Sequence, residues 1–191
     1  MQTQNKIKVA IMFAGCLLFR LLPFRPPNVE PILASQMPLA RQFGGFAGFL
    51  FGVLSILLYD MVTGTVGPWT LVTALAYGTV GLGAAWYFKG IKGDKGRKGE
   101  QGTLSVLRRR YAYFAIAGTL FYDAITGVTV GPLFFAQPFM AALFGQIPFT
   151  LMHLLGNVGF ALALSPMMEQ WMRRESVITA PSHCSAYASL R

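Results

Sequence analysis

The chain has 191 residues, of which 54% are hydrophobic and 12% are charged, and its formal net charge is +9. The charge-free stretch of residues 61–88 alone exceeds the roughly 20 apolar residues that cross a bilayer as a helix. This pattern excludes a soluble globular domain. It predicts an all-α, polytopic membrane protein, because a membrane barrel would show alternating segments of about ten residues instead.

The positive charge is concentrated in one part of the chain. Half of the 16 basic residues are Lys89, Lys92, Lys95, Arg97, Lys98, Arg108, Arg109 and Arg110. Such a cluster between apolar segments is typical of a cytoplasmic loop, which we expect over residues 89–109. It indicates attraction to anionic lipid rather than to nucleic acid.

Six helices are expected, at residues 7–22, 31–42, 44–62, 68–88, 110–126 and 148–172. They would form a six-helix bundle in a single transmembrane domain, residues 1–175, followed by a disordered cytoplasmic tail, residues 176–191. Pro68 and Pro148 suit the first turn of a helix, and Gly64 and Gly127 suit helix C-termini.

Two apolar segments do not fit simple spans. The short second helix, 31–42, has a length more typical of a re-entrant or interfacial piece. Residues 132–145 are apolar, but residues 132–172 are too long for one crossing, so 132–145 is expected to form an outer lid-like segment between helices five and six. The charges fit six spans with the N-terminus inside, or five spans with the N-terminus outside. Both arrangements place Asp60 and Asp123 on the outer side.

A short motif occurs twice, each time after a long uncharged stretch. Tyr-Asp, two residues, Thr-Gly and then Gly-Pro are found at residues 59–68 and again at residues 122–132. A carboxylate at the end of an apolar segment is costly, so Asp60 and Asp123 are expected to have a function. Two structural alternatives stay open: the carboxylates cap the helix starts at the Gly-Pro pairs, or they pair with Arg20 and Arg25.

Polar residues follow helical spacing on three of the expected helices. The stripes are Ser55, Tyr59, Asp60 and Thr63; Thr119, Tyr122, Asp123 and Thr126; and Gln146, Thr150, His153 and Asn157. Their convergence would form an outer pocket for a small molecule, although polar groups in membrane helices also bond simply to one another. The predicted substrate-binding residues are Asp60, Trp69, Tyr122, Asp123, Thr150, His153 and Asn157.

Small residues four apart occur in two helices. The pairs Ala10 with Ala14 and Gly48 with Gly52 would let another helix approach closely. The sequence contains none of the usual catalytic, phosphate-binding or metal-binding motifs, so no catalytic residue, metal or cofactor is expected.

These features resemble the substrate-binding S components of energy-coupling-factor (ECF) transporters. The resemblance covers residues 6–174 and rests on residues 10–14 of the first helix, the short second helix, and the turn at residues 41–48, where Gly45 replaces the usual proline. It favours six spans, with both termini cytoplasmic in the cell membrane. It implies capture of a vitamin-like solute and docking on a transmembrane coupling subunit with two ATPases, with Ala10 and Ala14 as the coupling-subunit interface.

Two other functions remain open at this point. A membrane scaffold in envelope or cell-shape assembly would use the glycine faces and the basic loop to hold partners. An intramembrane enzyme would use His153 and Asp123 as an acid–base pair.

Overall fold

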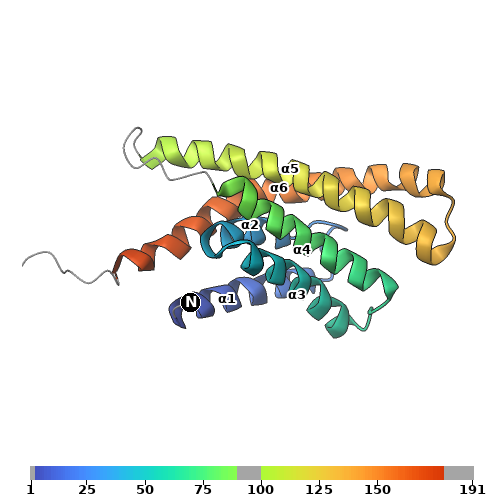
Figure 1. The fold of residues 1–191 in the computed structure, drawn as a ribbon, viewed down its shortest axis with the longest axis horizontal. Coiled ribbons are helices and arrows are strands. Elements are labelled where there is room, and N and C mark those ends of the chain that lie inside the picture. Colours follow the sequence, from blue (N-terminus) through green and yellow to red (C-terminus); the bar gives the residue numbers. More distant parts are fainter. Residues whose placement is uncertain (1–2, 90–99, 179–191) are drawn as a thin grey trace, which may run out of the picture.

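The computed structural model describes residues 3–89 and 100–178, and within these ranges its regular elements are all helices, joined by turns and short connections (Figure 1). The six helices are α1 (Thr3–Arg20), α2 (Ile32–Phe43), α3 (Gly45–Thr63), α4 (Pro68–Phe88), α5 (Glu100–Phe135) and α6 (Phe139–Ile178). This confirms the all-α fold and the number of helices. The central part of the predicted basic loop and the tail from residue 179 lie outside the described residues.

Glycine and proline set the boundaries of α3 and α4 as expected. Gly44 separates α2 from α3 with a φ of 91°, and Gly64 ends α3 in the left-handed conformation with a φ of 69°. Pro68 lies in the first turn of α4, where its missing amide hydrogen is not needed. The α3–α4 hairpin therefore follows directly from local sequence.

The last two helices are much longer than expected. Residues 100–109 belong to α5 rather than to a loop, and residues 132–145 are shared between the end of α5, a short turn and the start of α6. The expected lid-like segment is thus the helical tip of an α5–α6 hairpin. Gly127 and Pro148 were wrongly placed at helix ends, because both lie inside helices.

The surrounding bilayer explains why α5 and α6 continue through these residues. In a bilayer no water satisfies the backbone groups that a broken helix would expose, so glycine and proline are tolerated inside long helices. Pro132 and Pro148 therefore interrupt single backbone hydrogen bonds without ending α5 or α6.

Within the part of the chain that the structure describes, four helices are long and apolar enough to cross a membrane: Gly45–Thr63, Pro68–Phe88, Ser105–Phe135 and Phe139–Arg173. The protein is therefore embedded in the membrane. Helix α1 carries Lys6, Lys8 and Arg20 within its 18 residues, and α2 has 12 residues. Large apolar side chains on the outer faces of the long helices, such as Leu71 and Leu155, are exposed where lipid would surround them.

Helix α2 lies in the middle of the bundle. All of its residues from Ile32 to Ala40 are buried, and it packs against α3, α4 and α6. The short second helix is therefore a core element. It joins the α3–α4 hairpin to the α5–α6 hairpin.

Glycines let α2, α3 and α4 approach closely around one buried amide. Gln36 Nε2 donates to the carbonyl oxygens of Gly48 (2.9 Å) and Tyr77 (2.8 Å). A methyl group added at Gly48, Gly52 or Gly81 would overlap this amide or the neighbouring backbone. The predicted close approach at Gly48 and Gly52 is confirmed, and the approaching helices belong to the same bundle.

Candidate substrate-binding site

The centre of the candidate site is an acid–imidazole pair between α5 and α6. The Asp123 Oδ1 atom lies 2.7 Å from His153 Nδ1. The two residues are 1% and 3% exposed. Both come from predicted polar stripes, so helical spacing correctly indicated two faces that meet.

A chain of polar contacts leads from this pair to the α1–α2 connection. The other imidazole nitrogen, His153 Nε2, lies 3.3 Å from the Tyr77 hydroxyl of α4. That hydroxyl donates to Glu30 Oε1 at 2.6 Å, and Glu30 Oε2 pairs with Arg20 Nε at 2.9 Å. Five segments distant in sequence are therefore linked by buried polar groups.

The polar stripe on α3 is linked to these contacts through Arg20. The Arg20 guanidinium donates to the Ser55 carbonyl oxygen at 3.0 Å and stacks 3.9 Å above the Tyr59 ring. The Ser55 hydroxyl itself donates to the Phe51 carbonyl oxygen within α3. The α3 stripe thus supports the site from a distance, and it does not line the space between α5 and α6.

Aromatic rings cover one side of the acid–imidazole pair. The Tyr122 ring lies 4.2 Å from the Tyr77 ring, between centroids, and 5.6 Å edge-on from the His153 ring. Tyrosine faces beside polar groups are suited to holding a planar, polar ligand.

Two buried acceptor atoms in the cluster have no hydrogen-bond partner among the described residues. Asn157 Nδ2 donates to Thr119 Oγ1 at 2.8 Å, which leaves Asn157 Oδ1 without a donor. Asp123 Oδ2 also has no hydrogen-bond donor among the described residues. Because buried acceptors are normally satisfied, these two oxygens mark a place where a ligand with N–H or O–H groups would gain binding energy.

Thr150 lies on the same face of α6, one turn nearer the tip of the hairpin. Its hydroxyl accepts from Gln146 Nε2 at 3.4 Å, and its side chain is half-buried. The structure thus brings together four of the predicted residues, Tyr122, Asp123, His153 and Asn157, with Thr150 beside them.

Asp60 and Trp69 lie outside this cluster, at the α3–α4 junction. Asp60 Oδ2 accepts from the Thr70 hydroxyl at 2.6 Å, and Thr70 Oγ1 in turn accepts from the Gly67 amide at 3.0 Å. Asp60 thus supports Thr70, whose hydroxyl caps the start of α4, and Asp60 itself accepts from no backbone amide of that helix in the bonds that the structure shows. The Trp69 ring packs on the Phe135 ring, 5.6 Å between centroids, and connects this junction to the end of α5.

The sequence motif is therefore repeated without a repeated structure. In the first copy the helix ends, and the aspartate accepts a hydrogen bond from Thr70 in the first turn of the next helix. In the second copy α5 continues, and the aspartate contacts α6. Neither aspartate pairs with Arg20, whose partner is Glu30.

Three buried residues in or near the site were not predicted: Glu30, Gln36 and Tyr77. Glu30 had a detectable signal, because it is one of only seven acidic residues in the chain and directly precedes an apolar helix. The positions of Gln36 and Tyr77 follow from tertiary packing that spacing along one helix does not reveal.

A cavity of about 630 Å³ lies at the opposite end of the bundle from the cluster, beside Glu169. Glu169 follows His153 by 16 residues on α6, which is roughly 24 Å along the helix. No group of three or more histidine, cysteine, aspartate or glutamate side chains suited to a metal ion is found within the described residues.

Ala10 and Ala14 are exposed on one face of α1, while Met12 and Cys16 of the same helix are buried. Gly15 beside them has open space where a side chain would lie. This face of α1 is therefore accessible to another helix.

Comparison with protein families gives a match over most of the chain. The family described as "ECF-type riboflavin transporter, S component" matches residues 3–170, which include nearly all of the six helices. No curated protein matches the chain. The family match confirms the resemblance noted from the first helix, the short second helix and the glycine turn.

Proposed function

Because the chain belongs to the S-component family of ECF-type transporters, we propose that its α5–α6 polar cluster captures riboflavin or a closely related vitamin. Family membership makes the chain a transport subunit and not an enzyme. S components bind vitamin-like substrates and dock in the membrane on a coupling subunit that works with ATPases. We propose the identity of the vitamin, the residues that hold it and the face that docks on the coupling subunit.

The observation that carries the proposal is the pair of unpartnered acceptors beside packed aromatic rings. A flavin has a planar ring system with an imide N–H, and a side chain with several hydroxyl groups. Asp123 Oδ2 and Asn157 Oδ1 would accept from such donors, and the Tyr122 ring would pack against the flat ring system. Binding would replace two unsatisfied buried groups by hydrogen bonds, which favours affinity and selectivity.

Trp69 would form the outer rim of the same site. It precedes Tyr77 by eight residues, or about 12 Å along α4, on the way to the tip of the α5–α6 hairpin. Separation of the Trp69 and Phe135 rings would open the space between α4 and α5 toward the outside. Asp60 is not included in this site, because its carboxylate is occupied by Thr70.

The proposed orientation places the α3–α4 connection and the α5–α6 tip outside the cell. Arg41, Lys89, Arg173 and the arginines at residues 108–110 gather at the other end of the bundle, as expected for a cytoplasmic side. With this orientation, the N-terminus and the end of α6 are cytoplasmic.

The proposed docking face is the exposed side of α1 around Ala10 and Ala14. Small side chains there would let a helix of the coupling subunit approach closely, as small residues do between membrane helices. The face lies away from the substrate cluster, so capture and docking would use separate surfaces.

Mass spectrometry of small molecules released from the purified, denatured protein tests the substrate. The expected result is riboflavin or another flavin in near-equal molar amount to the protein, absent from a preparation of the Asp123→Asn variant. Release of a vitamin without a flavin ring would contradict the substrate assignment.

A further inference from the structure

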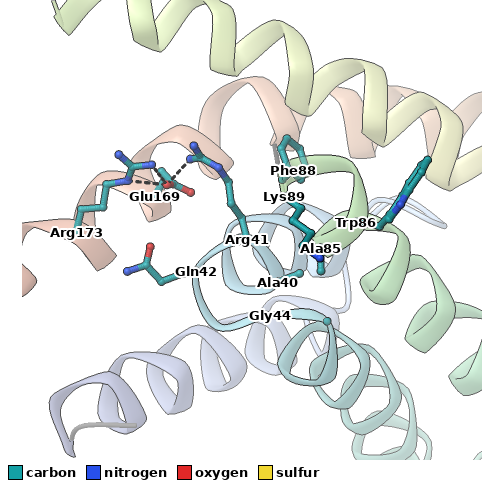
Figure 2. A pocket seen from close by; sticks show the side chains of 11 residues that line it. Ala40, Arg41, Gln42, Gly44, Ala85, Trp86, Phe88, Lys89, Glu169 and Arg173 are labelled. Atoms are coloured by element: carbon teal, nitrogen blue, oxygen red, sulfur yellow. Dashed lines mark hydrogen bonds and ion pairs between the residues drawn. The ribbon is translucent and has the colours of Figure 1, made fainter. Parts of the chain in front are cut away.

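A second feature of the molecule, unrelated to the substrate cluster, is the cavity at its basic end. It has a volume of about 630 Å³ and lies where the ends of α2 and α4, the start of α3 and the last part of α6 meet (Figure 2). Its lining residues are Ala40, Arg41, Gln42, Gly44, Gly45, Ala85, Trp86, Phe88, Lys89, Glu169 and Arg173. This volume is in the range of small-molecule sites.

The lining carries an excess of positive charge. Arg41, Lys89 and Arg173 face a single carboxylate, Glu169, so the lining has a net charge of +2, from three cations and one anion. Arg41 Nη1 and Arg173 Nε lie 2.5 and 2.7 Å from Glu169 Oε1. Figure 2 shows both arginines converging on Glu169, with the Lys89 side chain on the α4 side of the cavity.

The Glu169 carboxylate is fully engaged. Its Oε2 atom accepts from the Tyr111 hydroxyl at 2.7 Å, while Oε1 contacts the two arginines. It therefore fixes the guanidinium groups in place and does not neutralise Lys89. A fixed cluster of cations is a suitable site for an anion with several oxygen atoms.

The start of α3 adds to this preference. Gly44 and Gly45 line the cavity, and α3 begins at Gly45 without a side-chain cap and without an acidic residue in its first turn. The first amide groups of a helix and its dipole both favour a negative charge. Two independent features of the lining thus select an anion.

The α4 part of the lining is apolar, and one of its side chains is exposed. Trp86 is 81% exposed and lies two residues before the end of α4, next to Ala85. An exposed tryptophan at the end of a spanning helix is typical of the depth at which lipid headgroups meet acyl chains. A ligand with an anionic head and apolar chains matches both the cationic groups of the lining and the exposed Trp86.

We propose that this cavity binds the phosphate group of an anionic phospholipid in the inner leaflet, with Arg41, Lys89, Arg173 and the first amides of α3 as its partners. A free phosphate carries the same charged group but lacks the chains that would contact Trp86. The lipid is therefore the assigned source, and the experiment separates the two.

The test uses the full-length protein in detergent and native mass spectrometry with added phosphatidylglycerol or phosphatidylcholine. The informative variant is Lys89→Gln, because Lys89 is exposed and outside the Glu169 cluster. Lys6→Gln is the matched control, since Lys6 is an exposed lysine on α1 at the same end of the bundle and does not line the cavity. Both variants should elute as monodisperse protein.

Phosphatidylglycerol should bind the unmodified protein at least about fivefold more tightly than phosphatidylcholine. The Lys89→Gln variant should lose most of this preference. The Lys6→Gln variant should change it by less than about twofold. Excess inorganic phosphate should not displace the lipid. Equal losses in the two variants, or equal binding of the two lipids, would overturn the site. Displacement by inorganic phosphate with the same dependence on Lys89 would overturn the lipid as its ligand.

Discussion

Asp123 Oδ1 lies 2.7 Å from His153 Nδ1, whereas Asp60, at the equivalent position of the repeated motif, bonds the Thr70 hydroxyl across a helix junction. The same short motif therefore serves two purposes. One copy stabilises the turn between two helices, and the other forms the centre of a buried polar cluster. Because the two carboxylates have different partners, their removal should have different effects.

Replacement of Asp60 by alanine should lower stability without affecting substrate capture. The variant loses the hydrogen bond from the Thr70 hydroxyl at the start of α4, and loss of a buried hydrogen bond to a charged group costs about 2 kcal/mol. Thermal unfolding followed by size-exclusion chromatography should show a lower midpoint, while vitamin affinity stays within about twofold. A normal midpoint with strongly reduced affinity would instead place Asp60 in the binding site.

The close approach of α3 and α4 can be tested with two glycines of the same helix. In Gly81→Ala the new methyl group would overlap the Gly48 backbone and the Gln36 amide, so a loss of about 2–3 kcal/mol is expected. In Gly83→Ala the nearest atom is Phe114 Cζ at 3.8 Å, and the better helix propensity of alanine should stabilise slightly. Equal thermal stability of the two variants would contradict the close packing of α3 against α4 beside the Gln36 amide.

The Glu169 cluster should be sensitive to loss of its negative charge. Glu169→Gln leaves two arginines facing each other without a carboxylate, and breaking a buried ion pair costs about 3 kcal/mol or more. Tyr111→Phe removes a single hydrogen bond to the same carboxylate and should cost about 1 kcal/mol. Thermal stability measured in detergent should therefore fall much further in the first variant; the opposite order would be incompatible with the cluster.

The proposed docking face predicts separate effects on capture and assembly. Leucine at Ala10 or Ala14 should prevent the close approach of a partner helix while leaving the buried parts of the bundle unchanged. Co-purification with the coupling subunit and ATPases should drop, and vitamin binding by the isolated protein should persist. Ala117→Leu, at an exposed position of α5, is the control that should assemble normally; an equal loss there would point to a general effect of larger side chains.

Local sequence predicted the first four helices well. The boundaries of α3 and α4 differ from the expected ones by one residue at most, because Gly44, Gly64 and Pro68 act through backbone conformation alone. The same reasoning failed for α5 and α6. At Gly127, Pro132 and Pro148, packing between the two helices and the lack of water in the bilayer outweigh local preference.

The candidate site was predictable in part. Helical spacing placed His153 and Asn157 on one face and Thr119 and Asp123 on another, and these faces meet in the structure. Spacing could not show that Tyr77 and Glu30 complete the cluster, since their proximity depends on how α4 and the α1–α2 connection fold against α6. Asp60 was placed in the site because the motif repeats, but similar sequence did not produce similar surroundings.

The most direct test of flavin capture by the α5–α6 polar cluster is a titration of the purified, ligand-free protein with riboflavin, followed by quenching of flavin fluorescence. Asp123→Asn is compared with Thr126→Val, which changes a hydroxyl group that donates to the Tyr122 carbonyl oxygen within the same helix. We expect saturable binding of one flavin per chain, at least about tenfold weaker in Asp123→Asn and unchanged in Thr126→Val. Equal affinity in Asp123→Asn and the unmodified protein would contradict flavin capture by this cluster.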